Sequence, residues 1–263
     1  MLTRHSRNLL LLLAVLAGCR GVRTGAAHRE VSIAAAADLK FALDEISSDF
    51  GKRNPGIRVN VACGSSGNFY SQLQNQAPFD LFLSADMEYP RKLVEQGLGL
   101  SGTEFAYGVG RLAVWAPAGS PIAVQRLGIH ALQHPSVTHI AIANPRHAPY
   151  GRAAEAAMRS LGVYDAVRGK LVFGENVAQA LQFVQSGNAE IGIVALSLAV
   201  SPSVREQGQF WEVPLDSYPR MEQGGVILKW AKDADAARLF AAFLTKPEGR
   251  AILKKHGFML TGG

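Results

Sequence analysis

The spacing of apolar residues divides the chain into short segments of two alternating kinds. Compact apolar runs typical of buried strands alternate with stretches in which apolar residues recur at helical spacing. For example, an apolar run at 31–36 is followed by Leu39, Leu43, Ile46 and Phe50 at helical spacing. Because this order is repeated along the chain, the sequence predicts parallel sheets covered by helices.

The predicted segments form two successive groups. Strands are expected at 31–36, 57–63, 80–84, 111–116, 139–143, 171–173, 191–194, 209–214 and 225–230, and helices at 38–53, 66–76, 87–96, 124–132, 150–161 and 177–186, with two more closing the chain. Long strand-like crossings near 107–116 and 218–230 are where the chain could pass between two lobes. We therefore expect an α/β fold in which 31–110 and 219–263 form lobe 1 and 111–218 form lobe 2.

The N-terminal sequence predicts an export signal. Two arginines precede an apolar run at 9–17, which is too short to span a bilayer and is typical of a signal peptide. The run ends in Leu16-Ala17-Gly18-Cys19, which resembles the lipobox of bacterial lipoproteins. This predicts a signal peptide at 1–18, lipid attachment at Cys19 and a tether at 19–30. Ordinary cleavage near Ala26-Ala27 is the alternative, and both readings export the protein to the periplasmic face of a membrane.

Composition excludes some classes of function. A chain of 263 residues, 48% hydrophobic and 18% charged, suits a globular protein of one or two domains. The formal net charge is +6, but the predicted signal peptide holds two of the positive charges. The other lysines and arginines are scattered among acids without interleaved aromatics, so nucleic-acid binding gains no support. The remaining cysteine, Cys63, has no disulfide partner and is expected to be a small buried core residue.

The segment Gly64-Ser65-Ser66-Gly67 joins a predicted strand to a predicted helix. Glycines let the backbone approach a ligand closely, and the serines supply hydroxyl groups. The first N–H groups of the following helix have no partner inside the helix, and the helix dipole favours an anion there. The alternative interpretation is structural, with Ser66 acting only as the helix N-cap.

Three other segments have the same character, each at a place where a strand or loop meets the start of a helix. These are Ala35–Leu39, Pro149-Tyr150-Gly151 and Glu175-Asn176-Val177. All lie on the side where strands end, which is where open α/β sheets place ligands. Four helix starts could therefore converge on one small anion.

Other motifs favour structural roles. Gly97–Gly102 matches G-x-G-x-x-G but follows a helix, so a helix C-terminal loop is predicted instead of a dinucleotide site. His130 and His134 lack a third metal ligand. The Gly64–Asn68 stretch fails the G-x-S-x-G pattern at Asn68, and no histidine or acid is tied to it in sequence. No catalytic residue is predicted, although a serine hydrolase using Ser65 or Ser66 stays open as an alternative.

Several segments together resemble a known family, the substrate-binding protein of bacterial molybdate ABC importers, across nearly all of 31–260. They are Ala34–Leu39, Gly64–Gly67, Ala77–Asp86, Asn144–Gly151 and Gly192–Ala195. The run from Ala77-Pro78 to Ser84-Ala85-Asp86 is the most specific of these.

The resemblance implies a two-lobed periplasmic-binding-protein fold of type II. Each lobe would be a mostly parallel sheet flanked by helices, with the ligand in the interlobe cleft. It further implies a monomer that is not an enzyme, uses no cofactor, captures molybdate and also tungstate, and delivers it to a membrane permease. The alternative within this class is another tetrahedral oxyanion such as sulfate or phosphate. The implied oxyanion-binding residues are Asp38, Ser66, Tyr150 and Val177, with Ala37, Leu39 and Ser65 as secondary candidates.

Two departures from the family pattern concern the ligand contacts. Some members place a tyrosine hydroxyl at the position of Ala195, and position 38 is often Ser or Asn. An ionised Asp38 carboxylate ~4 Å from one unit of negative charge costs about 4 kcal/mol at an effective dielectric of 20. We therefore expect the Asp38 carboxylate to cap its own helix, with a main-chain N–H facing the ligand. A protonated, donating Asp38 and direct coordination by the carboxylate are the alternatives.

Overall fold

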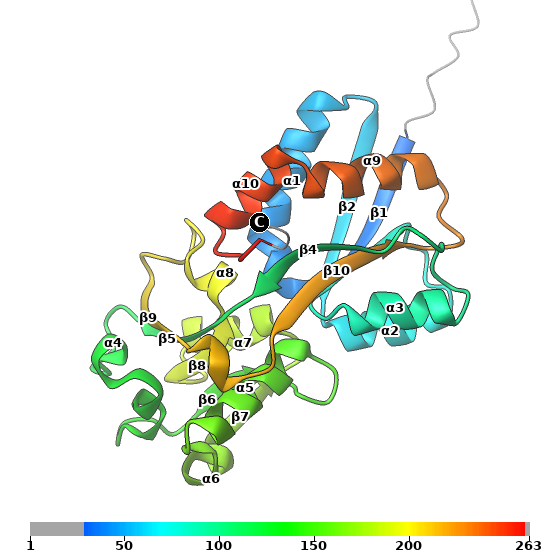
Figure 1. Cartoon of the computed structure of the whole chain (residues 1–263). Coiled ribbons are helices and arrows are strands. Elements are labelled where there is room, and N and C mark those ends of the chain that lie inside the picture. Colours follow the sequence, from blue (N-terminus) through cyan, green and yellow to red (C-terminus); the bar gives the residue numbers. More distant parts are fainter. Residues whose placement is uncertain (1–28, 261–263) are drawn as a thin grey trace, which may run out of the picture.

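The computed structural model describes residues 29–260, which form two five-stranded sheets flanked by helices (Figure 1). The predicted signal peptide and the lipid-attachment residue Cys19 lie outside the described residues. The last two residues of the predicted tether, Arg29 and Glu30, instead begin the first strand. Arg29 is held there by an ion pair with Asp233 at 2.6 Å, an interaction distant in sequence that local patterning could not reveal.

The first lobe is built on a sheet with the strand order β2-β1-β3-β10-β4. Its elements are β1 (Arg29–Ala36), η1 (Ala37–Leu39), α1 (Lys40–Arg53), β2 (Ile57–Gly64), α2 (Ser66–Gln74), β3 (Leu81–Ser84), α3 (Glu88–Glu95), β4 (Phe105–Gly110), β10 (Met221–Ile227), α9 (Ala234–Thr245) and α10 (Pro247–Lys255). Strands β2 and β3 pair parallel with β1, while β10 pairs antiparallel with β3 and β4. The sheet is therefore mixed, with β10 as its reversed strand.

Alternation along β1 explains how helices cover both faces of this sheet. Ile33 and Ala35 pack with residues of α1, α9 and α10 on one face. Ala34, between them, packs with residues of α2 and α3 on the other (Figure 1). Because successive strand residues point to opposite faces, an unbroken apolar strand is what a sheet buried on both sides requires.

The second lobe is built on a sheet with the order β7-β6-β8-β5-β9. Its elements are β5 (Leu112–Pro117), α4 (Val124–Leu127), η2 (Gly128–Gln133), β6 (Ile140–Ala143), α5 (Pro149–Ser160), α6 (Tyr164–Val167), η3 (Arg168–Lys170), β7 (Leu171–Gly174), α7 (Val177–Gln185), β8 (Ile191–Ala195), α8 (Leu196–Ala199), β9 (Gly208–Glu212) and η4 (Leu215–Ser217). Strand β5 pairs antiparallel with β8 and β9, so it is the reversed strand of this sheet.

The two reversed strands belong to the connections between the lobes. Strand β4 ends at Gly110 and β5 begins at Leu112, so only Arg111 separates a strand of the first sheet from one of the second. The chain returns to the first sheet through η4 and β10. The alternating strand–helix pattern did not predict this reversal, because a crossing strand has the same apolar composition whichever way it runs.

Several local expectations were wrong. Strand β4 was not predicted as separate from the strand at 111–116, and the last strand, expected at 225–230, ends at Ile227. Helix α1 begins at Lys40, and Asp38 lies in the short 3₁₀ turn η1 before it. Cys63 is exposed, because β2 is an edge strand whose residues are only partly covered. Among residues 29–260, no helix is long and apolar enough to cross a membrane.

Candidate anion-binding site

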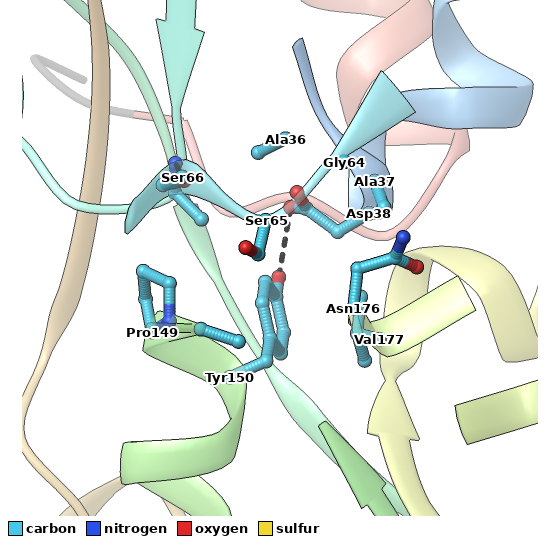
Figure 2. Close-up of a pocket in the computed structure, with 12 residues that line it drawn as sticks. Ala36, Ala37, Asp38, Gly64, Ser65, Ser66, Pro149, Tyr150, Asn176 and Val177 are labelled. Carbon is cyan, nitrogen blue, oxygen red and sulfur yellow. Dashed lines mark hydrogen bonds between the residues drawn. The ribbon is translucent and has the colours of Figure 1, made fainter. Parts of the chain in front are cut away.

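One pocket collects all four helix starts singled out in the sequence, and it lies where the two lobes meet (Figure 2). The first lobe contributes the end of β1 with η1, the turn between β2 and α2, and the residue after β3. The second lobe contributes the starts of α5 and α7. The lining residues are Ala36, Ala37, Asp38, Gly64, Ser65, Ser66, Ala85, Ala148, Pro149, Tyr150, Asn176 and Val177. Leu39 is not among them, because its side chain packs in the core of the first lobe.

The pocket is lined by main-chain N–H groups that have no acceptor. Ser66 and Val177 are the first residues of α2 and α7, and Tyr150 is the second residue of α5. The N–H groups of a first helical turn have no intrahelical partner. Within the described part of the chain, the N–H groups of these three residues find no other acceptor. Two lobes thus present free donors to one small space.

The Ser66 hydroxyl adds a side-chain donor to this set. Its Oγ accepts a hydrogen bond from the main-chain N–H of Ala85 at 3.0 Å. An oxygen that accepts there still has its own hydrogen to donate, and that hydrogen has no acceptor among residues 29–260. Because Ser66 is buried, an unused donor is costly unless a ligand accepts from it.

The N-cap of α2 is Ser65, one residue before the position that the structural interpretation of this turn assigned. The Ser65 Oγ accepts from the N–H of Asn68 at 3.4 Å and lies 2.9 Å from Nδ1 of His147 in the second lobe. The Ser66 hydroxyl is therefore available to the pocket, whereas the Ser65 hydroxyl is already bonded to protein atoms of both lobes.

The contact between Ser65 and His147 raises the question of catalysis, since sequence reasoning tied no histidine to this turn. A nucleophilic serine needs a histidine that is itself oriented by a third group. No acid among residues 29–260 bonds the His147 ring, and the Ser65 hydroxyl oxygen is already accepting as a cap. The pair therefore fits a contact between lobes better than a catalytic dyad.

Asp38 is held in a buried polar network and does not cap a helix. Its Oδ2 accepts from the Tyr150 hydroxyl at 2.9 Å (Figure 2). It also accepts from Gln223 Nε2 at 2.8 Å. No helix-capping bond is made by its side chain, so the expected cap is wrong. The physical reason is that Tyr150 and Gln223, remote in sequence, reach the carboxylate. Burial raises the pKa of Asp38 from 3.8 to about 6, although the bonds from Gln223 and Tyr150 counteract part of the rise.

Glu175 and Asn176 organise the second-lobe side of the pocket. Asn176 is the N-cap of α7 and accepts from the N–H groups of Ala178 and Gln179 at 2.9 and 3.0 Å. This capping uses the second and third N–H groups of the helix and leaves that of Val177 free. Glu175 reaches across to the first lobe, where it accepts from Asn68 Nδ2 at 2.8 Å.

The lobes touch closely around the pocket. The N–H of Gly67 donates to the carbonyl oxygen of His147 at 2.9 Å, and a Cβ on Gly67 would lie 2.4 Å from that oxygen. An ion pair between Arg152 and Asp86 at 2.8 Å also spans the lobes. The two lobes are therefore closed against each other. A side chain larger than that of glycine at position 67 would prevent this contact.

Sequence reasoning missed the polar residues that support the pocket from a distance. Gln223 on β10 bonds Asp38, and Ser197 on α8 donates its hydroxyl to the Asp38 carbonyl oxygen at 2.8 Å. Neither belongs to a motif, and their only sequence signal is a polar residue inside an apolar segment. Ala195 ends β8 as a buried residue and offers no hydroxyl, as expected. No cluster of metal-binding side chains occurs within residues 29–260.

Comparison with known proteins agrees with this geometry. The family model of bacterial extracellular solute-binding proteins matches residues 31–259. The chain belongs to this family. It is 38% identical to the molybdate-binding protein ModA of Rhodobacter capsulatus over 98% of this chain and 99% of that protein. It is 40% identical to ModA of Azotobacter vinelandii over 94% of this chain and 97% of that protein.

A solved structure supports the same assignment. The periplasmic molybdate-binding protein of Azotobacter vinelandii superposes with a TM-score of 0.82 and 31% identity, covering 88% of this chain and all of that one. The predicted two-lobed binding-protein fold is therefore confirmed. Members of a solute-binding family bind a ligand without transforming it, so the prediction that the chain is not an enzyme is also confirmed.

Proposed function

We propose that this solute-binding protein captures molybdate, and also tungstate, in the pocket between its lobes. The observation that carries the proposal is the convergence of unused donors: the N–H groups of Ser66, Tyr150 and Val177, and the Ser66 hydroxyl. Hydrogen bonds to a charged acceptor contribute about 1.5–3 kcal/mol each, so a tetrahedral dianion meets several such contributions at once. The molybdate-binding relatives support the choice of ligand.

Selectivity within the class would come from the size of the closed pocket. Molybdate, tungstate and sulfate are all tetrahedral dianions, so charge does not separate them. The donors are the main-chain N–H groups of three helix starts and the hydroxyl of a buried serine, which are rigid groups. Rigid donors suit one ligand radius. The smaller sulfate would leave some of these donors without a hydrogen bond, and a buried donor without an acceptor is costly.

A thermal-shift panel tests this proposal directly. Molybdate and tungstate at equal concentration should raise the melting temperature, and sulfate, phosphate and chromate should raise it less or not at all, because a ligand that binds only the folded state stabilises it. Equal stabilisation by sulfate and molybdate would contradict selection by size. Stabilisation by phosphate or sulfate alone would assign the pocket to another oxyanion.

The remaining parts of the proposal concern where and how the protein acts. We propose that it is exported, anchored through Cys19 and monomeric, that 31–110 with 219–263 and 111–218 are its lobes, and that it delivers its ligand to an ABC permease. The lipobox-like run before Cys19 and the permease association of the resembled family support this. Cys19→Ser should release the protein from the membrane fraction or leave its signal peptide uncleaved. Unchanged processing and membrane association would contradict the anchor.

A further inference from the structure

The pocket contains a buried carboxyl group with one oxygen satisfied and one without a partner. Asp38 is only 1% exposed. Its Oδ2 accepts two hydrogen bonds, from Tyr150 and Gln223, while its Oδ1 is buried with no partner among residues 29–260. No cation in the described part of the chain pairs with this carboxyl, since none of the ion pairs there includes it. A bare buried carboxylate oxygen beside an anion pocket requires an explanation.

The hydrogen positions in this network follow from its geometry. Gln223 Nε2 donates to the Tyr150 oxygen at 3.1 Å as well as to Asp38 Oδ2. The Tyr150 oxygen is an acceptor toward Gln223, so its own hydrogen points to Asp38 Oδ2. The opposite orientation of the Gln223 amide would set its oxygen against two other oxygens. Because Oδ2 already receives two donors, a proton on Asp38 has its place on Oδ1.

Hydrogen bonding offsets only part of the cost of burying the Asp38 charge. Gln223 and Tyr150 stabilise the ionised form and, more weakly, so do the main-chain N–H groups of Asp38 and Leu39, but burial outweighs them. Tyr150 on α5 and Tyr107 on β4 are neutral at physiological pH, because burial raises the pKa of each well above 10. On β2, the residue Cys63 is exposed by surface area, but its thiol is partly desolvated; this partial desolvation and the Asp38 charge raise the pKa of the thiol to about 11, so it too is neutral. Gln223 on β10 and Ser197 on α8 carry no charge. A dianion entering the pocket would therefore face a carboxylate whose charge is only partly offset, and the addition of a proton removes this repulsion.

We propose that Asp38 enters the ligand complex protonated, with its Oδ1–H donating to a ligand oxygen, so that capture of a dianion takes up one proton. The balance is simple: an ionised Asp38, one proton from solution and one dianion give a neutral carboxylic acid bonded to the dianion. This rests on the proposed function, since it needs a dianionic ligand. A pKa of about 6 leaves roughly one free protein molecule in ten already protonated at pH 7, and a dianion shifts the balance further toward protonation.

Protonation of Asp38, a residue of the first lobe, should make molybdate binding depend on pH. Above pH 7 the free protein is almost fully ionised at Asp38, so molybdate affinity should fall about tenfold for each further pH unit. Asp38→Asn places an N–H₂ group where the protonated Oδ1 would be and keeps an oxygen for Tyr150 and Gln223. The variant should bind molybdate with no such slope between pH 7 and 9.

Calorimetric titration of the full chain with sodium molybdate at pH 8 measures the proton directly. The observed enthalpy is compared in Tris and HEPES, whose ionisation enthalpies differ, and the slope against that enthalpy counts protons taken up. We expect about one for the parent and for the matched control Asp44→Asn, whose exposed carboxyl lies on α1. We expect none for Asp38→Asn. The proton count of the parent protein needs no variant, so the proposal can be contradicted even if Asp38→Asn fails to fold.

The outcomes separate this inference from the function on which it rests. Molybdate binding by the parent with no proton uptake would overturn the inference and leave the proposed function standing. Proton uptake that persists in Asp38→Asn but is lost in His147→Gln would overturn it as well, because the proton would then belong to the imidazole. The absence of any molybdate-induced stabilisation would overturn the proposed function, and the inference with it.

Discussion

The two halves of the pocket are built from different chemistry. The first lobe presents mainly side chains, namely the Ser66 hydroxyl and the Asp38 carboxyl, beside the single main-chain N–H of Ser66. The second lobe presents mainly backbone, with the N–H groups of Tyr150 and Val177 at the starts of α5 and α7. Its polar side chains nearby bond to protein atoms: Asn176 caps α7, and the Tyr150 hydroxyl reaches over to Asp38.

Because of this difference, single substitutions can remove the ligand contacts of the first lobe more easily than those of the second. A side-chain donor is lost by one mutation, whereas a main-chain donor survives any substitution that keeps the helix start in place. It also gives the lobes separate roles. The first lobe sets the charge and protonation of the complex, and the second lobe adds donors only when it closes over the ligand.

The largest effect should come from separating the two halves without altering either. Gly67→Ala would place a Cβ 2.4 Å from the His147 carbonyl oxygen, so the lobes could not approach to their present distance. The donors of Tyr150 and Val177 would then be lost to the ligand. At about 1.5–3 kcal/mol each, the loss amounts to roughly 3–6 kcal/mol, or about a hundredfold to ten-thousandfold in affinity by calorimetry.

The matched control is Gly51→Ala in α1. No atom lies within 4 Å of a Cβ at that position, and alanine favours a helix, so affinity should be unchanged and stability slightly increased. If Gly67→Ala bound molybdate as tightly as Gly51→Ala, the closed contact between α2 and His147 would not be part of the bound state.

The carboxyl of the first lobe should also make stability of the ligand-free protein depend on pH. Asp38 has a raised pKa, near 6, so between pH 4 and 6 the folded state keeps a proton that the unfolded chain releases. The free energy of unfolding therefore falls as pH rises through this window, by about 3 kcal/mol in all, and stays low above it. Urea unfolding of Asp38→Asn should lack this fall. Parallel curves for parent and variant would show that Asp38 titrates normally.

The sequence predicts the fold of this molecule better than it predicts the details of the pocket. Periodicity places most of the helices and strands of both sheets, because apolar spacing reflects burial directly, but it did not separate β4 from β5 and it placed β10 a few residues too late. The reversed strands β5 and β10 are not predictable in this way, since direction leaves no local signature. The helix starts of the pocket follow from turn chemistry at Ser66 and Val177. The network that fixes Asp38 does not, because Gln223 is 185 residues away along the chain.

The side-chain half of the pocket is tested next by its hydroxyl groups. Ser66→Ala should remove a buried donor to a dianion and weaken binding by about 1.5–3 kcal/mol, roughly tenfold to a hundredfold. Ser65→Ala should cost less affinity, because its hydroxyl caps α2 and contacts His147 instead. Calorimetric titrations of both variants decide this, and the reverse order would mean that Ser65 is the ligand contact.

The smallest effect should come from the phenol of the second lobe, although Tyr150 lies at the centre of the pocket. Tyr150→Phe keeps the main-chain N–H that faces the ligand and removes only the hydroxyl bond to Asp38, which Gln223 still partly satisfies. The net loss is about 1 kcal/mol in the closed state, but losing this bond also raises the pKa of Asp38 and eases its protonation, so molybdate binding should weaken by at most about fivefold. Tyr107→Phe is the matched control, since this equally buried hydroxyl donates to the Ser84 carbonyl at 2.9 Å within the first lobe. It should lower thermal stability without changing affinity. A hundredfold loss in Tyr150→Phe beside normal binding in Tyr107→Phe would place the phenol itself on the ligand, and the division into a side-chain half and a main-chain half would no longer hold.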